Sequence, residues 1–407
     1  MEKKHFFITL ASFLILETIF SFVINALPFM TYFRYASVLV AILLFVGYWK
    51  KWRKVSPWFC LLIALTLGYT VLMSILTKGT QNGIADQIAI PFAAVACICI
   101  GASLSFQDQT KNNFLYALYG GLILLGVVSL FYTLYSFGFF YILKHPDSSL
   151  VHDAGMFVGI EFALVDIRYF GYYFCLLSSG CAALWFGRTE KGNLKLVMLV
   201  GGILGLIGVL TLPYWTGLIL SIGGLILSLG ICYFPKKKKI RIIIYSALGA
   251  ILLLGICLIV IKRNSIPRVK LFFDILKNCF RYPLGGQPTF EEYGVVNSYN
   301  IFMDALAVGG IIPFLSLVAL FGYTIYLTIR YYRYSEDFLL KKGCIITFLI
   351  QYFIYVNLNY RESIFIKYKD CIPLFMDPIF GIVLIFIGYM FYQQQKKKQI
   401  PAENESN

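Results

Sequence analysis

The sequence is poor in charged residues. Asp, Glu, Lys and Arg make up only 14% of the 407 residues, whereas a soluble domain usually contains about 25%. So few charges cannot provide a polar shell for a chain that is 59% hydrophobic. This shortage excludes a soluble enzyme and a disordered protein, and it indicates a polytopic membrane protein.

The sequence also lacks several motifs that define function classes. No Walker A motif is present, which excludes ATP-driven transport by this chain, and no Cys/His cluster has the spacing of a metal site. The ten cysteines are too few for a disulfide framework, and most of them lie in apolar runs. We therefore expect neither a metal nor a cofactor. The paired broken helices with repeated carboxylates that are typical of secondary transporters are missing too.

Long apolar runs fill most of the chain. A bilayer-spanning helix needs about 20 apolar residues, and on this basis we expect an all-α protein with twelve transmembrane helices, within a range of ten to thirteen. The predicted spans are 6–26, 33–49, 58–76, 87–106, 114–137, 169–187, 195–212, 216–234, 241–261, 306–329, 343–358 and 373–392. Residues 1–407 then form a single integral membrane domain with a short tail at 393–407.

The positive charges give the orientation of these spans. With twelve spans both termini lie on one side, and the short segments on that side hold the larger share of the 35 basic residues. The positive-inside rule makes this side cytoplasmic. The run Lys236–Lys239 is therefore read as a topology anchor beside anionic lipid rather than as a nucleic-acid site.

Two long loops are predicted on the outer side, at 136–168 and 262–305, and a shorter one at 359–371. Long loops in a compact protein are more often functional than merely connecting. Apolar residues recur at helical spacing within 268–277, which predicts a short amphipathic helix that suits the bilayer surface.

Three arginines in these outer loops run against the charge bias: Arg168, Arg268 and Arg281. One interpretation is that each is an interfacial residue whose stem lies along the apolar surface. The other is a cluster for a phosphate or diphosphate group, which matches the bidentate geometry of arginine.

The motifs around the second loop resemble a known family. After Arg268 come Tyr282-Pro283-Leu284-Gly285-Gly286, then Tyr299-Asn300 and Gly309-Gly310-Ile311-Ile312-Pro313, while Arg168-Tyr169-Phe170-Gly171 stands earlier at the end of a span. This order is similar to that of the O-antigen ligase/polymerase superfamily of bacterial membrane proteins, in particular the Wzy-type polymerases. Tyr299 stands where the family has histidine, and Pro313 replaces its last glycine.

The resemblance implies a GT-C-like architecture and a glycosyltransferase that polymerises oligosaccharide repeat units into capsular or exopolysaccharide or O-antigen. The substrates would be undecaprenyl-diphosphate-linked oligosaccharides on the outer face of the bacterial cytoplasmic membrane. Membrane lipid is a further partner, other polysaccharide-assembly proteins are candidate partners, and nucleic acid is not expected.

The resemblance also implies roles for individual residues. Arg168 and Arg268 would hold the diphosphate without a metal, with Arg281 and Arg361 as further ligands and Gly285-Gly286 in the substrate-binding turn. Tyr299 and Asn300 would orient a sugar or phosphate. The general base stays open among Glu161, Asp166, Glu291, Glu292 and His152.

Two alternatives share these features. A flippase or exporter of the same lipid-linked oligosaccharide would also be basic and aromatic-rich, but it should carry cations in the middle of its spans, where this sequence has none. A ligase-like transferase would differ from the polymerase only in the acceptor that receives the glycan.

Overall fold

The computed structural model describes the parts of the chain at 57–76, 193–211, 215–233, 267–293, 298, 300–335, 337, 339–358 and 378–404, together with shorter pieces between 94 and 127, at 156–161, at 175–181, and at 242 and 246. This part of the chain is mostly helical, with a non-helical turn region at 279–288 and one pair of two-residue strands. In β1 (Met156–Phe157) and β2 (Ile160–Glu161), Met156 pairs with Glu161 in an antiparallel register.

The long helices are α4 (Pro57–Leu76), α10 (Asn193–Thr211), α11 (Trp215–Tyr233), α16 (Ile311–Tyr334), α17 (Leu339–Leu358) and α18 (Pro378–Asn404). The short ones are α13 (Pro267–Asn278), α14 (Thr289–Glu292), α15 (Ile301–Asp304) and the π-helix η1 (Ala305–Gly309). A proline opens α4, α13 and α18, at the position where its missing N–H costs no helical hydrogen bond.

Several predicted spans coincide with these helices. Helices α4, α10 and α11 match the runs at 58–76, 195–212 and 216–234 within two residues at each end, because each is an uncharged or nearly uncharged apolar run. The described residues within 87–106, 114–137 and 169–187 are helical as well. The prediction of twelve spans is not decided, because other predicted spans lie outside the described residues.

Several boundaries differ from the prediction: α17 begins at Leu339 rather than at 343, and α18 at Pro378 rather than at 373. The run predicted at 306–329 begins as a helix only at Ile311, because η1 and Gly310, with a φ of 86°, separate α15 from α16. The last helix does not end at 392 but continues through the predicted tail to Asn404, where glutamine and lysine are good helix formers.

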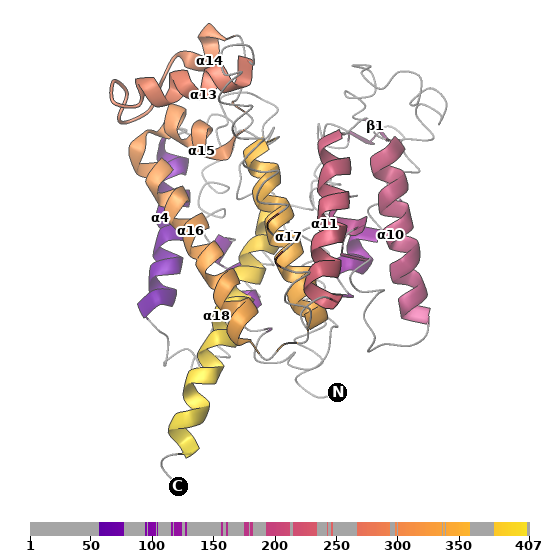
Figure 1. Ribbon diagram of the computed structural model, residues 1–407. Coiled ribbons are helices and arrows are strands. Elements are labelled where there is room, and N and C mark those ends of the chain that lie inside the picture. Colours follow the sequence, from indigo (N-terminus) through magenta and orange to yellow (C-terminus); the bar gives the residue numbers. More distant parts are fainter. Residues whose placement is uncertain are drawn as a thin grey trace.

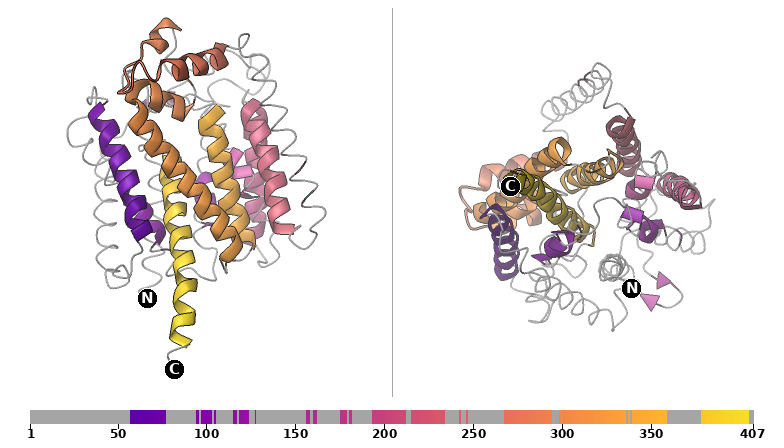
Figure 2. Two further views of the ribbon diagram at one scale, coloured as in Figure 1. Left: turned by 60° about the vertical axis from the view of Figure 1, so that its left-hand side comes forward. Right: turned by 90° about the horizontal axis from the view of Figure 1, so that it is seen from below.

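The long helices run roughly along one direction and form a bundle (Figure 1). Helix α16 packs against α4 and α18, and α17 packs against α11. The lower part of α18 projects beyond the other helices, as the side view also shows (Figure 2). The core between them is rich in buried aromatic side chains, including Tyr331, Phe348 and Tyr389.

Two glycines let α18 approach the helical residues around position 100 closely. A Cβ atom on Gly101 would overlap the backbone oxygen of Ile385, and one on Gly388 would overlap that of Ile98. Small residues at such crossings allow helix backbones to touch. These paired glycines fix α18 in the centre of the bundle.

Among the described helices, α16 alone is long and apolar enough to cross a membrane by length and composition. Only 28% of its most apolar window is buried. Helix α10 likewise exposes large apolar side chains such as Leu196, Val200 and Leu210. Both helices therefore present apolar surface outward.

The residues from 267 to 311 form a cap across one end of the bundle (Figure 1). The inner face of α13 is apolar, with Leu271 and Ile275 packed against Leu306 and Ala307 of the π-helix. This confirms the amphipathic helix predicted at 268–277. The cap is the part of the described structure that holds most of the predicted site.

Candidate functional site

The frame of the site is the turn at 282–287, which is hydrogen-bonded to the π-helix. The N–H of Gly286 donates to the oxygen of Val308 at 3.0 Å, and the N–H of Gln287 donates to that of Ala307 at 2.9 Å. These bonds satisfy backbone groups of a segment that forms neither a helix nor a sheet there. The turn and the start of the next long helix thus form one unit.

Two glycines allow the turn to approach so closely. Gly285 and Gly310 both have a φ of 86°, in the left-handed region that favours glycine. A Cβ on Gly285 would overlap the backbone of Val308, and one on Gly310 would overlap the backbone of Pro283. The N–H of Ile311 donates to the oxygen of Pro283 at 2.9 Å, which closes the contact from the other side.

Asn300 ties the cap to the bundle. It is the N-cap of α15, where its Oδ1 accepts the N–H groups of Phe302 at 3.0 Å and Met303 at 3.1 Å. Its Nδ2 donates to the backbone oxygen of Asn357 at 3.0 Å and to the side-chain Oδ1 of the same residue at 3.1 Å. Because Asn357 lies near the end of α17, this one side chain joins two distant parts of the chain.

Asp304 is buried beneath this junction. Its side chain is 0% exposed, and its Oδ1 accepts the N–H of Ser298 at 2.7 Å. Its Oδ2 has no hydrogen-bond partner among the described residues, and the phenol of Tyr69 on α4 interacts with it electrostatically. Burial raises the pKa of Asp304 to about 7, although the bonds from Ser298 lower it. A carboxyl with these properties exchanges its proton near neutral pH.

Ser298 and Asn300, both near Asp304, are hydrogen-bonded to each other. The hydroxyl of Ser298 donates to the backbone oxygen of Asn300 at 2.9 Å, and the N–H of Asn300 donates to the same hydroxyl at 3.2 Å. Ser298 is therefore held by the Asp304 carboxyl, and Asn300 by Asn357.

The surface of the cap carries cations held by aromatic rings. The guanidinium of the exposed Arg281 lies 5.7 Å from the ring centre of Tyr282, and the ammonium of Lys270 lies 5.7 Å from that of Tyr293. The hydroxyl of Tyr293 in turn donates a short hydrogen bond to Asp274. The cap thus has exposed cations outside and a buried carboxyl beneath.

No protein-family model matches the chain, and no curated protein matches it.

The cap brings part of the predicted site together. Arg281, Gly285, Gly286 and Asn300 all lie in it, and the backbone of Arg268 is the second residue of α13. Arg168, Tyr299 and Arg361 lie outside the described residues. Gly285 is packed on the π-helix, whereas Gly286 faces open space, so of the two only Gly286 is open to a substrate.

The candidate bases are spread over the chain. Glu292 is exposed at the end of α14, and the backbones of Glu291 and Glu161 lie in α14 and β2. Asp166 and His152 lie outside the described residues. In the part of the chain that the structure describes, no group of three or more His, Cys, Asp or Glu residues could hold a metal ion, and a metal-free reaction stays a prediction.

Sequence reasoning missed Asp304 and Asn357. Asp304 stands immediately before the apolar run predicted at 306–329, and Asn357 stands at the end of the run at 343–358. A carboxyl or amide at the edge of an apolar run is a default functional candidate, and this signal could have marked both. Nothing in the sequence indicates that Asn357 meets Asn300.

Asn300 has two roles: it caps α15, and it tethers the cap to α17 through its hydrogen bonds to Asn357. We expect substitutions to separate these two roles. Asn300→Ser keeps an oxygen that can cap α15 but removes the Nδ2 donor to Asn357, so it should lower the free energy of unfolding by roughly 1–2 kcal/mol. Asn300→Ala also removes the cap and should cost about 1 kcal/mol more. Thermal unfolding of the purified protein measures both, and a wild-type stability of Asn300→Ser would contradict a role of the contact with Asn357.

Proposed function

We propose that the chain is a multi-pass protein of the bacterial cytoplasmic membrane, with about twelve transmembrane helices and both termini in the cytoplasm. The outward apolar side chains of α10 and α16 support this, because a soluble protein rarely exposes so continuous an apolar surface. The cap supports it too, since Phe273, Phe280 and Leu284 are exposed there. Exposed aromatic and aliphatic groups beside lysine and arginine suit the interface between lipid and water.

We propose further that the protein polymerises undecaprenyl-diphosphate-linked oligosaccharide repeat units by metal-independent glycosyl transfer. The observation that carries the proposal is the cap, which places an exposed arginine and a buried carboxyl with a pKa near 7 at one end of a helical bundle. Transfer from a diphosphate needs a cation for the leaving group and a base for the incoming hydroxyl.

The reaction breaks one bond and forms another. The bond between the anomeric carbon of the donor glycan and its diphosphate oxygen breaks, and the bonding electrons leave with the diphosphate. The hydroxyl oxygen of the acceptor repeat unit forms the new glycosidic bond, and its proton passes to a base. Arg281, with Arg168 and Arg268, would stabilise the charge that develops on the leaving group.

Asp304 joins the candidate bases of this reaction. Its Oδ2 accepts no hydrogen bond from a described residue, and a pKa of about 7 suits proton uptake at physiological pH. The carboxyl is fully buried. Proton transfer to it therefore requires that the acceptor glycan displace part of the cap.

Reconstitution tests the proposal. Purified protein in liposomes with lipid-linked repeat units and EDTA should form a ladder of longer glycans without ATP. Arg281→Ala should slow this by roughly ten- to a hundredfold, because a charged hydrogen bond to the leaving group contributes roughly 1.5–3 kcal/mol. Lys270→Ala removes another exposed cation of the same cap and should leave the rate within about twofold of the wild type, since Arg281 still engages the leaving group.

Three results would contradict the polymerase. Movement of repeat units across the bilayer without a ladder would instead identify a flippase. Transfer of single glycans to another lipid or a protein would identify a ligase-like transferase. A ladder that is lost in EDTA and restored by a divalent cation would show that the reaction needs a metal.

A further inference from the structure

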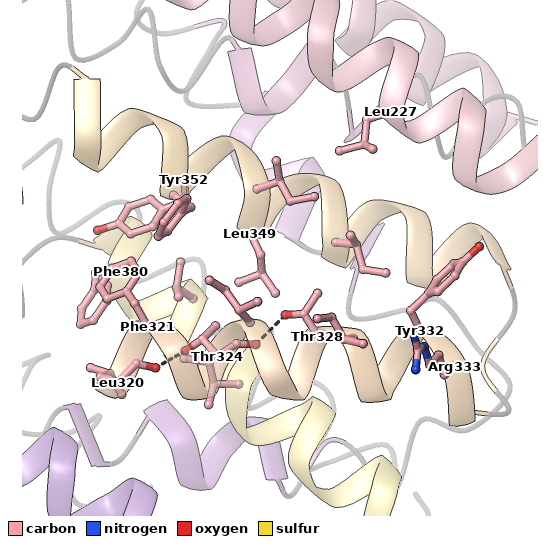
Figure 3. A pocket seen from close by; sticks show the side chains of 17 residues that line it. Leu227, Leu320, Phe321, Thr324, Thr328, Tyr332, Arg333, Leu349, Tyr352 and Phe380 are labelled. Carbon is pink, nitrogen blue, oxygen red and sulfur yellow. Dashed lines mark hydrogen bonds between the residues drawn. The ribbon is translucent and has the colours of Figure 1, made fainter. Parts of the chain in front are cut away.

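An apolar groove of about 600 Å³ lies between α11, α16, α17 and α18 (Figure 3). Its lining includes Leu227 of α11, Phe321 of α16, Leu349 of α17 and Phe380 of α18. Ile350, on its wall, is partly exposed. The groove runs along the length of the long helices, from Phe321, whose ring centre lies 5.2 Å from that of Phe302 in the cap, toward the opposite end of the bundle.

The middle of the groove offers no free hydroxyl to a ligand. Thr324 and Thr328 line it, but the hydroxyl of Thr324 donates to the oxygen of Leu320 at 2.8 Å, and that of Thr328 donates to the oxygen of Thr324 at 2.8 Å. Figure 3 shows both bonds running along α16. With their hydroxyls engaged, the threonines present their methyl groups to the groove, and a ligand there must be apolar.

The one charged residue among the described residues that line the groove lies at one end of it. Tyr332 and Arg333 line it at the end of α16 farthest from the cap, opposite Tyr352 and Phe380 (Figure 3). Next to it, the ammonium of Lys342 donates to the backbone oxygens of Tyr332 at 3.3 Å and Ser335 at 2.6 Å. The segment 330–342 holds four basic and two acidic residues, so this end attracts anions.

We infer that this groove binds an anionic phospholipid, with an acyl chain along α16 and the phosphate against Arg333. This inference rests on the proposed membrane location. The stretch of α16 from Leu320 to Arg333 covers about 20 Å at 1.5 Å per residue, which is enough for a chain that spans one leaflet of a hydrocarbon core about 30 Å thick. Because Arg333 lies at the end opposite the cap, the phospholipid belongs to the cytoplasmic leaflet.

The position of the cation distinguishes this lipid from the proposed donor. The diphosphate of a polyprenyl donor would lie at the cap, near Arg281, whereas the groove ends in a cation at the opposite end of the bundle. A single lipid headgroup cannot contact both Arg281 and Arg333. The groove thus holds a second lipid, which supports the packing of α16 against α17 rather than taking part in glycosyl transfer.

Lipid-dependent thermal stability of the purified full-length protein in detergent tests the inference. Dioleoyl phosphatidylglycerol should raise the unfolding midpoint by several degrees, and dioleoyl phosphatidylcholine with the same chains should raise it much less. Arg333→Gln should weaken the apparent affinity for phosphatidylglycerol at least tenfold, while Arg333→Lys should retain most of it. Arg330→Gln is the matched control, because Arg330 lies one turn away, over the rings of Tyr326 and Tyr334, and does not line the groove.

A second pair of variants tests the shape of the groove. Ile350→Trp narrows it and should reduce the shift caused by phosphatidylglycerol, whereas Ile312→Trp adds the same bulk at an exposed position of α16 outside the groove and should not. Equal responses of Arg333→Gln and Arg330→Gln would overturn the inference. So would a polyprenyl diphosphate that binds the groove regardless of Arg333. The assay contains no glycan, so its result is independent of whether the protein is a polymerase.

Discussion

Gly285→Ala is expected to disrupt the cap. The new methyl group would overlap the backbone of Val308, and the residue would have to keep a φ of 86°. A left-handed residue with a side chain costs about 1–2 kcal/mol, and overpacking against a fixed backbone costs about as much or more. We expect a total loss of roughly 2–5 kcal/mol, concentrated in the turn at 282–287 and the π-helix.

Gly286→Ala provides the matched control. Gly286 also has a positive φ, of 75°, but a Cβ there would meet nothing within 4 Å. Only the cost of the left-handed backbone should remain, a loss of about 1–2 kcal/mol in the free energy of unfolding. Hydrogen exchange read by mass spectrometry over 282–311 measures the effect where it arises. If the two alanine variants exchange alike, the contact between the turn and the π-helix does not hold the cap together.

Asp304→Asn is expected to stabilise the protein at pH 8 and to abolish most of its activity. The pKa of Asp304 is about 7 in the folded protein, above the ordinary 3.8, so the folded state binds this proton more tightly than the unfolded state does. The stability that the protonated carboxyl provides is fully present below the unfolded pKa and is lost as the pH rises through about 7. An uncharged asparagine avoids that loss, so it should raise the free energy of unfolding at pH 8 by up to roughly 4 kcal/mol and change it little at pH 4.

Activity should move in the opposite direction. Asparagine can still accept the N–H of Ser298, but it cannot take up the proton of the acceptor, so ladder formation should fall about a hundredfold or more. Asp274→Asn removes a carboxylate from the surface of the same cap and should leave the pH dependence of stability in place. A ladder at the wild-type rate in Asp304→Asn would show that another group is the base, and an unchanged stability at pH 8 would show that the buried carboxyl is not held neutral.

The helices were predictable where hydropathy alone determines them. The runs at 58–76, 195–212 and 216–234 contain almost no charge and form helices within two residues of those limits at each end. The helix at 268–277 was predictable because its apolar residues follow the helical period. The start of α16 was not, because Ala305 to Gly309 are as apolar as the residues after them. The π-helix there depends on the bonds between Val308, Ile311 and the turn at 282–287.

Of the predicted site residues, Arg281, Gly285, Gly286 and Asn300 lie in the cap. That they form a site, and the chemistry of that site, stay predictions. The contact of Asn300 with Asn357 spans 57 residues of sequence, and no local pattern specifies such a pair. The burial of Asp304 likewise depends on α4, a helix more than two hundred residues earlier in the chain.

The π-helix at Ala305–Gly309 has a consequence for insertions and deletions in this segment. A π-turn holds one residue more than the α-helical turn that could replace it, and each residue of an α-helix turns the chain by about 100°. Loss of one residue from 305–309 would therefore let α15 continue as a regular α-helix up to Gly310, with Asp304 rotated by about 100° relative to Gly310 and to the faces of α16 that pack on α4 and α18. Asp304 could then no longer stay buried while α16 keeps its neighbours. The length of this five-residue segment, more than its composition, sets the angular relation between the cap and the bundle.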